Sequence, residues 1–376
     1  MTLESLADES TAASESRATG VGEPSTSRRV AVLVDEVAEL EAVRTGQVAP
    51  GQGTARVIAA LESLGYEPVE LALRPGKTEE WLSRLLADDF GFAFNLCETV
   101  GGVAQGEHLA AAAVELLRLP MTGASAETLL FCLHKDRCSA ILRANGVTVP
   151  EWKVVRRSDP RPDDWSHYPA IVKPVADDAS NGVHSNSVVN SKQELVEAIK
   201  RVHVTWDGAL VQRYIAGREI NLAIVGRHLL PPAEIDFSTL PEDVPPIVSY
   251  EAKWVYGSAE DLGTRPVCPA PLPARQAEGL QRLAARAWRL MSGRGYGRVD
   301  IRLTEDDVPY VIDINPNPDL SVDAGLARQA RAAGWSYDEL IRRIVDDALG
   351  GNGDGSRPAG DWVFVEPRLE PVGEPE

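Results

Sequence analysis

The sequence is poor in cysteine and has fewer basic than acidic residues. Its 376 residues include four cysteines (Cys97, Cys132, Cys138 and Cys268), none of them in a CxxC pair. This spacing favours a reduced, cytoplasmic protein over a disulfide framework or a zinc site. The 38 Lys and Arg residues against 56 Asp and Glu give a net charge of −18, which argues against a nucleic-acid partner. No apolar run reaches the roughly 18 residues of a membrane span, so we expect no membrane partner.

Both ends of the chain are predicted to lie outside the folded part. Residues 1–27 lack aromatic side chains and are rich in Ser, Thr, Glu and Gly, which is typical of a disordered leader. This stretch has neither a basic n-region nor an apolar core, so it does not predict a secretory signal. Residues 350–376 are predicted as a flexible tail, within which "DWVFVEP" could dock as a short strand.

Between these ends, the pattern of strands and helices predicts three domains. "RRVAVLVDE" carries a continuous apolar run typical of a buried parallel strand, and alternating strands and helices follow it. We expect an N-terminal parallel α/β substrate domain over 28–122 and a small central α+β domain over 123–207. Several short strands then predict a C-terminal domain with a mixed sheet over 208–349. The expected fold class is α/β combined with α+β.

A predicted hairpin brings acidic side chains together. "GRVDIRL" and "YVIDIN" alternate apolar and polar residues, and "TEDDVP" between them supplies turn residues. A turn centred on 306–307 places Asp300 opposite Asp313, and the period of two keeps Asn315 on the same face as Asp313. Like charges directly across a ladder destabilise it. Two carboxylates and an amide suit Mg²⁺, which accounts for the pairing; the alternative is a polar, solvent-facing edge of the strand.

Three lysines lie in apolar or acidic surroundings. Lys173 interrupts the apolar "AIVKPV", Lys135 lies in "LHKDR" and Lys253 in "SYEAKW". The small-residue loop "ADDASNGVHS" after Lys173 could close over phosphates with backbone N–H groups. It matches neither the Walker loop nor the dinucleotide fingerprint. Each lysine taken alone could also be a side chain that extends to the surface.

Four motifs in this order resemble the ATP-grasp ligases, and most closely the D-alanine–D-alanine ligase branch. They are "IVKPV…DASNG", "VQRYIAGREINLAIVG", "IVSYEAKW" and "GRVDIRL…PYVIDINPNPDLS", and the resemblance covers roughly residues 28–349. It implies a three-domain ATP-grasp architecture with ATP between the central and C-terminal domains. It also implies an ADP-forming carboxylate–amine ligase, in which a carboxylate is phosphorylated to an acyl phosphate that an amine then attacks.

The resemblance gives roles to the residues that match its motifs. Lys135 and Lys173 would hold the α and β phosphates and Lys253 the γ-phosphate. Glu219 would bind the ribose hydroxyls, and residues 212–215 would read adenine largely through backbone groups. The implied cofactor-binding residues are Lys135, Lys173, Ser180, Gly182, Gln212, Tyr214, Ile215, Glu219 and Lys253.

The same resemblance implies a metal set and two catalytic cations. Asp300, Asp313 and Asn315 look like the ligands of two Mg²⁺ ions, with Mn²⁺ as an alternative ion. Arg298 would face the tetrahedral intermediate, and Lys253 would act on the transferred phosphoryl group. This division agrees with phosphoryl transfer, which depends on positioning and charge neutralisation.

The substrate region departs from the family pattern. The dipeptide-forming ligases usually have Ser, Tyr and Gly where this chain has Ala179, Trp254 and Asp319, and we expect these three and Ser321 to lie near the amino-acid subsites. "NLCETVGG" and the acidic loop "DEVAELEAVRTGQVAPG" also differ from the family. Three acids of this loop could hold a substrate ammonium: Glu36, Glu39 and Glu41.

We therefore expect amide or peptide bond formation on an amino acid or small peptide other than D-alanine. A true D-alanine–D-alanine ligase is the alternative within the class, and an ATP-grasp carboxylase is a third ATP-dependent possibility. A non-catalytic, ATP-binding regulatory protein is the alternative of another class. The expected partners are small-molecule amino acids or peptides, and the resemblance allows a homodimer.

Overall fold

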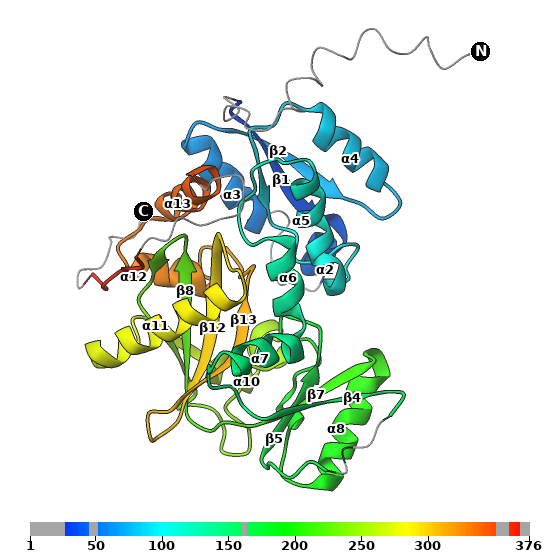
Figure 1. The fold of residues 1–376 in the computed structure, drawn as a ribbon, viewed down its shortest axis with the longest axis vertical. Coiled ribbons are helices and arrows are strands. Elements are labelled where there is room, and N and C mark those ends of the chain that lie inside the picture. The colour runs from blue at the N-terminus through cyan, green and yellow to red at the C-terminus, as the bar shows by residue number, and fades with distance from the viewer. Residues whose placement is uncertain (1–26, 45–51, 160–161, 163, 351–360, 369–376) are drawn as a thin grey trace.

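The computed structural model describes residues 27–44, 52–159, 162, 164–350 and 361–368. They form three sheets: a parallel one near the N-terminus, a four-stranded one, and a mixed seven-stranded one. Figure 1 shows the N-terminal sheet at the top of the molecule, the seven-stranded sheet in the middle and the four-stranded sheet at the bottom. The predicted leader 1–27 lies outside the described residues except for Ser27. Within the described chain, no helix is long and apolar enough to cross a membrane.

The N-terminal sheet is parallel, with the order β2-β1-β3. Its central strand contains the predicted apolar run, and Val30 to Leu33 are fully buried, because a central parallel strand has both faces covered. The acidic stretch predicted as a loop starts with a helix instead, and its residues 45–51 lie outside the described part. The strands are β1 (Arg29–Asp35), β2 (Glu67–Leu73) and β3 (Phe92–Asn95), and the helices are α2 (Glu36–Arg44), α3 (Gln52–Ser63), α4 (Thr78–Ala87), η1 (Ala104–Gly106) and α5 (Glu107–Leu116).

The four-stranded sheet is antiparallel throughout, with the order β4-β7-β5-β6. A helical pair precedes it, as the sequence predicts, and Ser125 caps the first helix by accepting a hydrogen bond from Thr128 N at 3.2 Å. The helices are α6 (Ala126–Leu133), α7 (Lys135–Ala144), η2 (Ser185–Ser187) and α8 (Lys192–Thr205), and the strands are β4 (Trp152–Arg156), β5 (Ala170–Pro174), β6 (Val188–Val189) and β7 (Gly208–Arg213).

The seven-stranded sheet follows the order β11-β10-β8-β12-β13, and β9 pairs with β8 and β14. The strands are β8 (Arg218–Val225), β9 (His228–Leu229), β10 (Ala233–Asp236), β11 (Arg265–Val267), β12 (Tyr296–Leu303), β13 (Pro309–Asn315) and β14 (Val363–Phe364), and the helices are α9 (Tyr250–Trp254), α10 (Ala259–Gly263), α11 (Ala274–Leu290), α12 (Gly325–Ala332) and α13 (Tyr337–Gly350).

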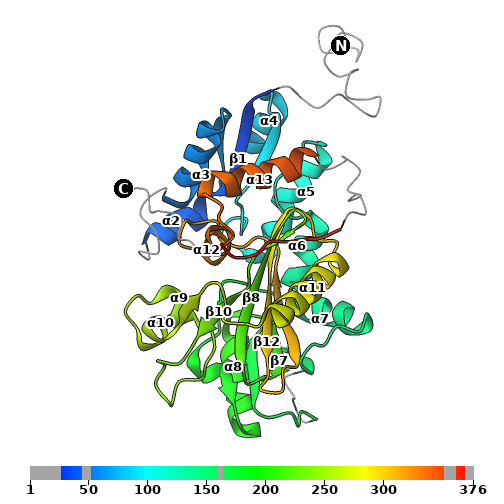
Figure 2. The ribbon, with the colours of Figure 1, turned by 90° about the vertical axis from the view of Figure 1, so that its left-hand side faces the viewer.

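This sheet has one apolar and one polar face in its middle. Ile220, Val299 and Ile301 pack in one core cluster with Leu280 and Trp288 of α11, which lies across the sheet in Figure 2. The alternate positions of the same strands carry charged and amide side chains. Because successive residues of a strand point to opposite faces, the sequence that builds the core on one side also builds a polar surface on the other. We call this polar surface the polar face; it consists of Glu219, Asn221, Arg298, Asp300, Arg302, Asp313 and Asn315.

The C-terminal segment forms a strand within the predicted tail. Val363 and Phe364 pair in parallel with His228 and Leu229, so "DWVFVEP" docks as expected. Residues 351–360 and 369–376 lie outside the described part of the chain. The residue boundaries of the three predicted domains stay a prediction; β7, which starts at the predicted boundary 207/208, pairs with β4 and β5 of the central sheet.

Candidate active site

The hairpin register agrees with the prediction. Asp300 pairs with Asp313 and Arg298 with Asn315, and both pairs have residue numbers that sum to 613. The register shifts after Asp300, where a β-bulge leaves Ile301 opposite Val311. The bulge lies next to the acidic pair, the kind of place where bulges redirect side chains near functional sites. The two carboxylates therefore lie on one face of neighbouring strands.

Asp300 is held by two neighbours on the polar face. The Arg298 guanidinium donates from Nε to Oδ1 at 2.7 Å and from Nη2 to Oδ2 at 2.9 Å, a bidentate geometry that fixes both planes. Asn221 of β8 donates from Nδ2 to the same Oδ1 at 2.8 Å. Burial lowers the pKa of Arg298, but the charge and hydrogen bonds of Asp300 outweigh it and the pKa is raised.

Asp313 is surrounded by cations from other elements. Lys135, at the start of α7, lies 3.5 Å from Asp313 Oδ2 and 2.8 Å from Asp178 Oδ1. Lys173 of β5 donates to the Ile312 carbonyl at 3.5 Å. Burial raises the pKa of Asp313, but Lys135, Lys173 and other cations outweigh it and lower the pKa. The carboxylate therefore stays ionised in this position.

The two buried lysines differ in their charge balance. Burial lowers the pKa of Lys135, but Asp178 and Asp313 outweigh it, so the pKa is raised. For Lys173, burial and the neighbouring Lys135 outweigh Asp313, so the pKa is lowered. Both side chains are more than nine-tenths buried. Buried ammonium groups that have carboxylate neighbours are suited to an anionic ligand, since the cost of their desolvation is already met by the fold.

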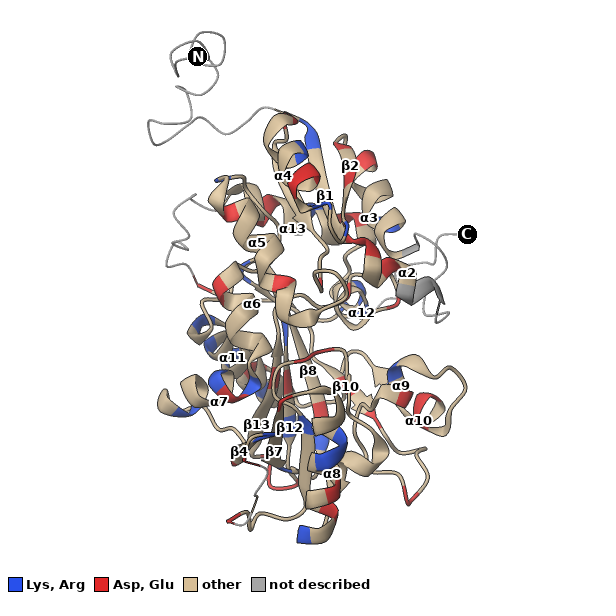
Figure 3. Cartoon of the chain, turned by 90° about the vertical axis from the view of Figure 1, so that its right-hand side faces the viewer, with Lys and Arg blue, Asp and Glu red and all other residues tan. Residues whose placement is uncertain are grey.

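Lys253 lies on the short helix α9, on the other side of the polar face. Its side chain is exposed, yet desolvation by surrounding atoms and the positive charge of Arg298 lower its pKa. Asp300 and Asp313 act in the opposite direction. In Figure 3, β12 and β13 lie in the middle of the molecule between α7 and α9, which carry Lys135 and Lys253.

Glu219 is a member of a buried ion pair. Its Oε2 lies 2.9 Å from Arg302 Nη2, and the two side chains are 8% and 4% exposed. Arg302 also donates to the Gly217 and Pro246 carbonyls and lies over the Tyr214 ring. Burial raises the pKa of Glu219, and the Arg302 charge lowers it only in part. The acid predicted for the ribose hydroxyls is therefore also a structural partner of Arg302.

The residues predicted to read adenine, 212–215, lie at the end of β7 and directly after it. Gln212 lies in β7 and is 3% exposed, and Ile215 is 5% exposed. Tyr214 donates its backbone N–H to the Pro169 carbonyl at 2.9 Å and its hydroxyl to the Pro246 carbonyl at 3.3 Å. The segment is thus fixed between the four-stranded sheet and the loop before α9.

The predicted phosphate loop has an unusual backbone. Ala179 and Ser180 have φ angles of 55° and 60°, in the left-handed region that L-residues rarely adopt. Gly182 has φ 70°, and a Cβ there would come within 2.8 Å of the Trp206 ring. The N–H groups of Asn181 and Val183 donate to the Asp178 and Ser180 carbonyls within the loop and fix the turn. Successive backbone N–H groups of a turn are a common site for anions.

The donor set on the polar face fits a divalent cation. Asp300 and Asp313 provide carboxylate oxygens in register and Asn315 an amide oxygen, the hard oxygen ligands that Mg²⁺ prefers. Among the described residues, no group of three or more His, Cys, Asp or Glu side chains gathers as a metal cluster. The set therefore has two carboxylates only, the number with which Mg²⁺ commonly binds beside substrate phosphates.

Two of the predicted substrate residues, Asp319 and Ser321, lie in the segment that follows β13. Asp319 accepts from the Ser321 backbone N–H at 2.7 Å. Glu39 of α2 accepts from Thr54 at 2.7 Å, and Gly53 beside Thr54 lies close to Ser321, whose Oγ would be 3.8 Å from an added Cβ. Glu39 thus belongs to a chain of neighbours that leads to Ser321.

The other two candidate acids of the N-terminal stretch are not brought to Ser321 in this way. Glu36 instead pairs with Arg74, the residue that follows β2, at 2.7 Å. The side chain of Glu41 lies outside the described residues. Trp254 donates its Nε1–H to the Ala179 carbonyl at 2.9 Å, so these two predicted residues contact each other.

Several polar residues at this site were missed by the sequence reasoning. Glu98 follows β3 and is exposed, but desolvation by nearby protein atoms, with Asp319 and Asp178, raises its pKa to about 7. Glu107 is buried, accepts from Asn317 at 3.1 Å, and has a pKa raised well above its usual value by burial. Glu98 was visible only as part of "NLCETVGG", and Asn317 as part of "NPNP". Their neighbours in the fold, Glu107 for Asn317 and Asp319 for Glu98, are distant in the sequence, so no local pattern links them.

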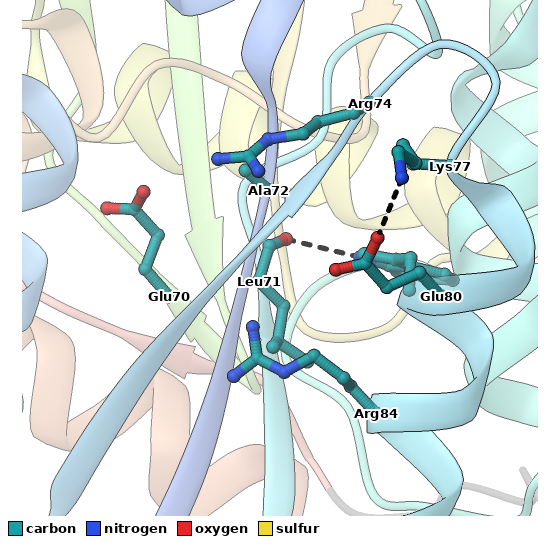
Figure 4. A pocket seen from close by; sticks show the side chains of 8 residues that line it. Glu70, Leu71, Ala72, Arg74, Lys77, Glu80 and Arg84 are labelled. Atoms are coloured by element: carbon teal, nitrogen blue, oxygen red, sulfur yellow. Dashed lines mark hydrogen bonds and ion pairs between the residues drawn. The ribbon is translucent and has the colours of Figure 1, made fainter.

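Two hollows differ in their relation to this site. One of about 100 Å³ lies between β2 and α4, lined by Arg74, Lys77, Trp81 and Arg84 among others, and contains none of the predicted site residues (Figure 4). The other, of about 10 Å³, touches Lys135 and Asp313 and has room for about one water molecule. The charged side chains around Asp313, and not the size of the hollow, make this region the candidate site.

The fold and this arrangement define an ATP-grasp ligase. The family model for the D-Ala–D-Ala ligase C-terminus matches residues 141–346. The uncharacterized protein y4sG of Sinorhizobium fredii is 31% identical, with 78% of this chain and 86% of that protein covered. A D-alanine–D-alanine ligase of Geobacter sulfurreducens is 30% identical over 80% and 90%. The chain belongs to the D-alanine–D-alanine ligase family and is an ATP-dependent, ADP-forming ligase.

Solved structures share the fold. A D-alanine–D-alanine ligase of Bacillus anthracis complexed with ATP has a TM-score of 0.66 and 23% identity, with 86% of this chain and 97% of that chain covered. The VanG D-Ala:D-Ser ligase of Enterococcus faecalis has a TM-score of 0.69 and 17% identity over 86% and 99%. These similarities agree with the predicted three-domain architecture.

Proposed function

We propose that the protein joins the carboxylate of one amino acid or small peptide to the amine of another, with substrates other than D-alanine. A carboxylate oxygen attacks the γ-phosphorus of ATP and ADP leaves. The amine nitrogen then attacks the acyl carbon, phosphate leaves with the C–O bonding electrons, and the amine loses its proton. The observation that carries the proposal is the position of three cations on the polar face. Lys135 lies 3.5 Å from Asp313, Lys173 donates to the Ile312 carbonyl, and Arg298 pairs with Asp300. The charge of a fourth cation, Lys253, helps to lower the pKa of Asp313.

Each cation would have a separate part in the phosphoryl transfer. Lys135 and Lys173 are buried and held in place, so they suit the phosphates that stay with ADP. Lys253 is open to solvent and suits the γ-phosphate, which moves during the reaction. Arg298 is oriented by Asp300 and would neutralise the oxyanion of the tetrahedral intermediate. Fixed charges are effective here because they need no reorganisation as the transition state forms.

The metal-binding role of Asp300, Asp313 and Asn315 is part of this proposal. Their oxygen atoms would hold one or two Mg²⁺ ions, and a bound ion would neutralise charge on the β and γ phosphates. Arg298 and Asn221 would keep the Asp300 carboxylate in the orientation that such an ion requires.

The substrate is the part that the relatives leave open. D-alanine–D-alanine ligases among them favour D-alanine as the alternative substrate. Against it, Ala179 has no hydroxyl, and Trp254 uses its N–H on the Ala179 carbonyl. Asp319 adds a negative charge that raises the pKa of Glu98 together with burial. The acidic surroundings of Asp319 and Glu98 suit a substrate that carries an ammonium group in addition to the amine that is acylated.

The test is a panel of amino acids and dipeptides with ATP and Mg²⁺, followed by ADP release and product mass. We expect amide formation with at least one pair other than D-alanine. Efficient formation of D-alanyl-D-alanine as the preferred product would refute the substrate part. ATP binding without release of phosphate across the whole panel would instead support a regulatory protein. A homodimer and a cytoplasmic location stay predictions.

A further inference from the structure

Two segments far apart in sequence are joined beside the γ-phosphate lysine. One is the predicted phosphate loop, and the other is the stretch that leads into α9. We call the joined segments, 179–184 and 248–254, the clamp. Four contacts hold the clamp together: Ser180 Oγ donates to the Val248 carbonyl at 2.9 Å, Tyr250 N donates to the Val183 carbonyl at 2.7 Å, His184 Nδ1 lies 2.7 Å from Glu251 Oε1, and Trp254 Nε1 donates to the Ala179 carbonyl at 2.9 Å.

The helix that carries Lys253 cannot hold its own position. α9 has only five residues, from Tyr250 to Trp254, far fewer than an isolated helix needs to be stable in water. Ser249 caps its start by accepting from Ala252 N at 3.2 Å, but a cap fixes a helix locally and not relative to the rest of the fold. Ser258 Oγ also donates to the Glu251 carbonyl and α10 packs against α9, but both belong to the same stretch of chain. The contacts to the phosphate loop therefore set the position of α9 relative to the four-stranded sheet.

Lys253 lies between two clamp residues in the sequence. Glu251 comes two positions before it and Trp254 one position after it, and both contact the loop. The Lys253 side chain is exposed, and its pKa responds to Arg298 and Asp300 of the polar face. The loop thus orients α9 through Glu251 and Trp254, while the Lys253 side chain stays free to bind a phosphate.

The loop in turn depends on the helix. Ala179 and Ser180 both have left-handed φ angles, which L-residues adopt only when surrounding contacts impose them. Trp254 holds the carbonyl of the first of these residues, and the second is bonded to the Val248 carbonyl. A loop conformation that binds phosphates and a helix that carries a phosphate-binding lysine are therefore stabilised by the same hydrogen bonds.

We propose that Trp254 is a positioning residue, which sets Lys253 on the γ-phosphate by locking α9 to the strained phosphate loop. Glu251, through His184, makes the second lock. The inference rests on the γ-phosphate role of Lys253 in the proposed function. It places Trp254 in the nucleotide machinery as well as beside the substrate.

The test compares nucleotide affinities in purified full-length variants. Titration calorimetry with Mg²⁺ gives the dissociation constants of ADP and of a non-hydrolysable ATP analogue for Trp254→Phe, Lys253→Met and the double variant. Phe keeps one aromatic ring but removes the N–H donor together with the second ring of the indole, so Glu251→Gln, which keeps the size of its side chain, is compared with it throughout. Tyr256→Phe is the matched control, because Tyr256 lies two residues after the clamp and is fully exposed. Glu251→Gln tests the second lock and serves in place of Trp254→Phe if that variant does not fold.

The expected result is a loss of preference for the ATP analogue over ADP. Removing one hydrogen bond is worth about 1 kcal/mol, so Trp254→Phe should lower the preference about fivefold with ADP affinity within about twofold of wild type. The double variant should show the same preference as Lys253→Met, because Trp254 can no longer affect the preference once the lysine that it positions has been replaced. Tyr256→Phe should leave both constants unchanged.

Three results would overturn the inference. They are an unchanged preference in both Trp254→Phe and Glu251→Gln, additive losses in the double variant, and an unchanged preference in Lys253→Met. A change confined to the KM of the amino-acid substrate would instead make Trp254 a pocket wall only. If no substrate pair gives an amide but the expected affinity pattern holds, the ligase proposal fails and the positioning role stands.

Discussion

The buried pair of Glu219 and Arg302 gives the sharpest prediction on stability. Glu219→Gln keeps the shape of the side chain and removes its charge, so Arg302 would remain buried without its counter-charge. Breaking a buried ion pair by removing one partner costs about 3–5 kcal/mol. The side chains are 8% and 4% exposed with the charged atoms 2.9 Å apart, which places this pair in the buried class. Arg302 keeps its bonds to the Gly217 and Pro246 carbonyls, so we expect the lower end of that range.

The assay is urea unfolding followed by tryptophan fluorescence. Trp288, one of the eight tryptophans of the chain, is fully buried where α11 packs on this sheet, so the emission includes a signal from the sheet. With a slope of about 3 kcal/mol per molar urea, a loss of about 3 kcal/mol moves the midpoint down by about 1 M. Glu305→Gln, at an exposed position of the hairpin turn, is the matched control and should change stability by less than about 0.5 kcal/mol.

A double variant separates the pair from its members. Replacing a whole buried ion pair by uncharged side chains is often neutral, so Glu219→Gln/Arg302→Met should regain most of the stability that the single change loses. A loss of less than about 1 kcal/mol in Glu219→Gln would refute the reasoning, because it would show that water reaches the pair. A double variant as unstable as the sum of the single changes would refute the coupling.

Three further predictions concern the site. Asp313→Ala should abolish Mg²⁺-dependent ADP release while circular dichroism stays unchanged; a collapse of the fold would instead make Asp313 a structural residue. Lys253→Met should lower turnover far more than it weakens ADP binding, measured by steady-state kinetics and calorimetry, and equal losses in both would contradict its γ-phosphate role. The pKa of Glu98 is raised to about 7 from 4.5, so its stabilising contribution is complete below pH 4.5 and is lost as pH rises through 7. Glu98→Gln should therefore unfold at higher urea than wild type above pH 7, and a pH-independent difference would count against the raised pKa.

The sequence predicted what depends on short-range pattern. Alternation in two neighbouring strands was enough to pair Asp300 with Asp313, because a hairpin turn fixes the register of strands next to each other in sequence. The same period gave Asn315 and Arg298 their common face. The apolar run at Val30–Val34 likewise predicted a buried central strand.

Contacts between distant segments were beyond this reasoning. The pairing of Lys135 with Asp178 joins α7 to a loop 43 residues later, and that of Glu219 with Arg302 crosses two strands that are 83 positions apart in the numbering. No local period encodes such contacts, since they depend on how whole elements pack. The acidic stretch after β1 failed for another reason. Its charged residues predict a loop, but Glu36–Arg44 is helical, because its Glu and Ala residues favour a helix.

The strand β14 has a practical consequence for anyone who shortens this protein. Residues 350–376 look dispensable by composition, but β14 covers the edge of β9. Phe364 of β14 and the preceding Trp362 lie against Arg282 and Arg289 of α11. Cutting the chain at 350 would leave β9 paired with β8 alone and would uncover its other edge, on which other chains can assemble. A shortened protein that precipitates would then report a lost sheet edge and not a defect of the catalytic centre.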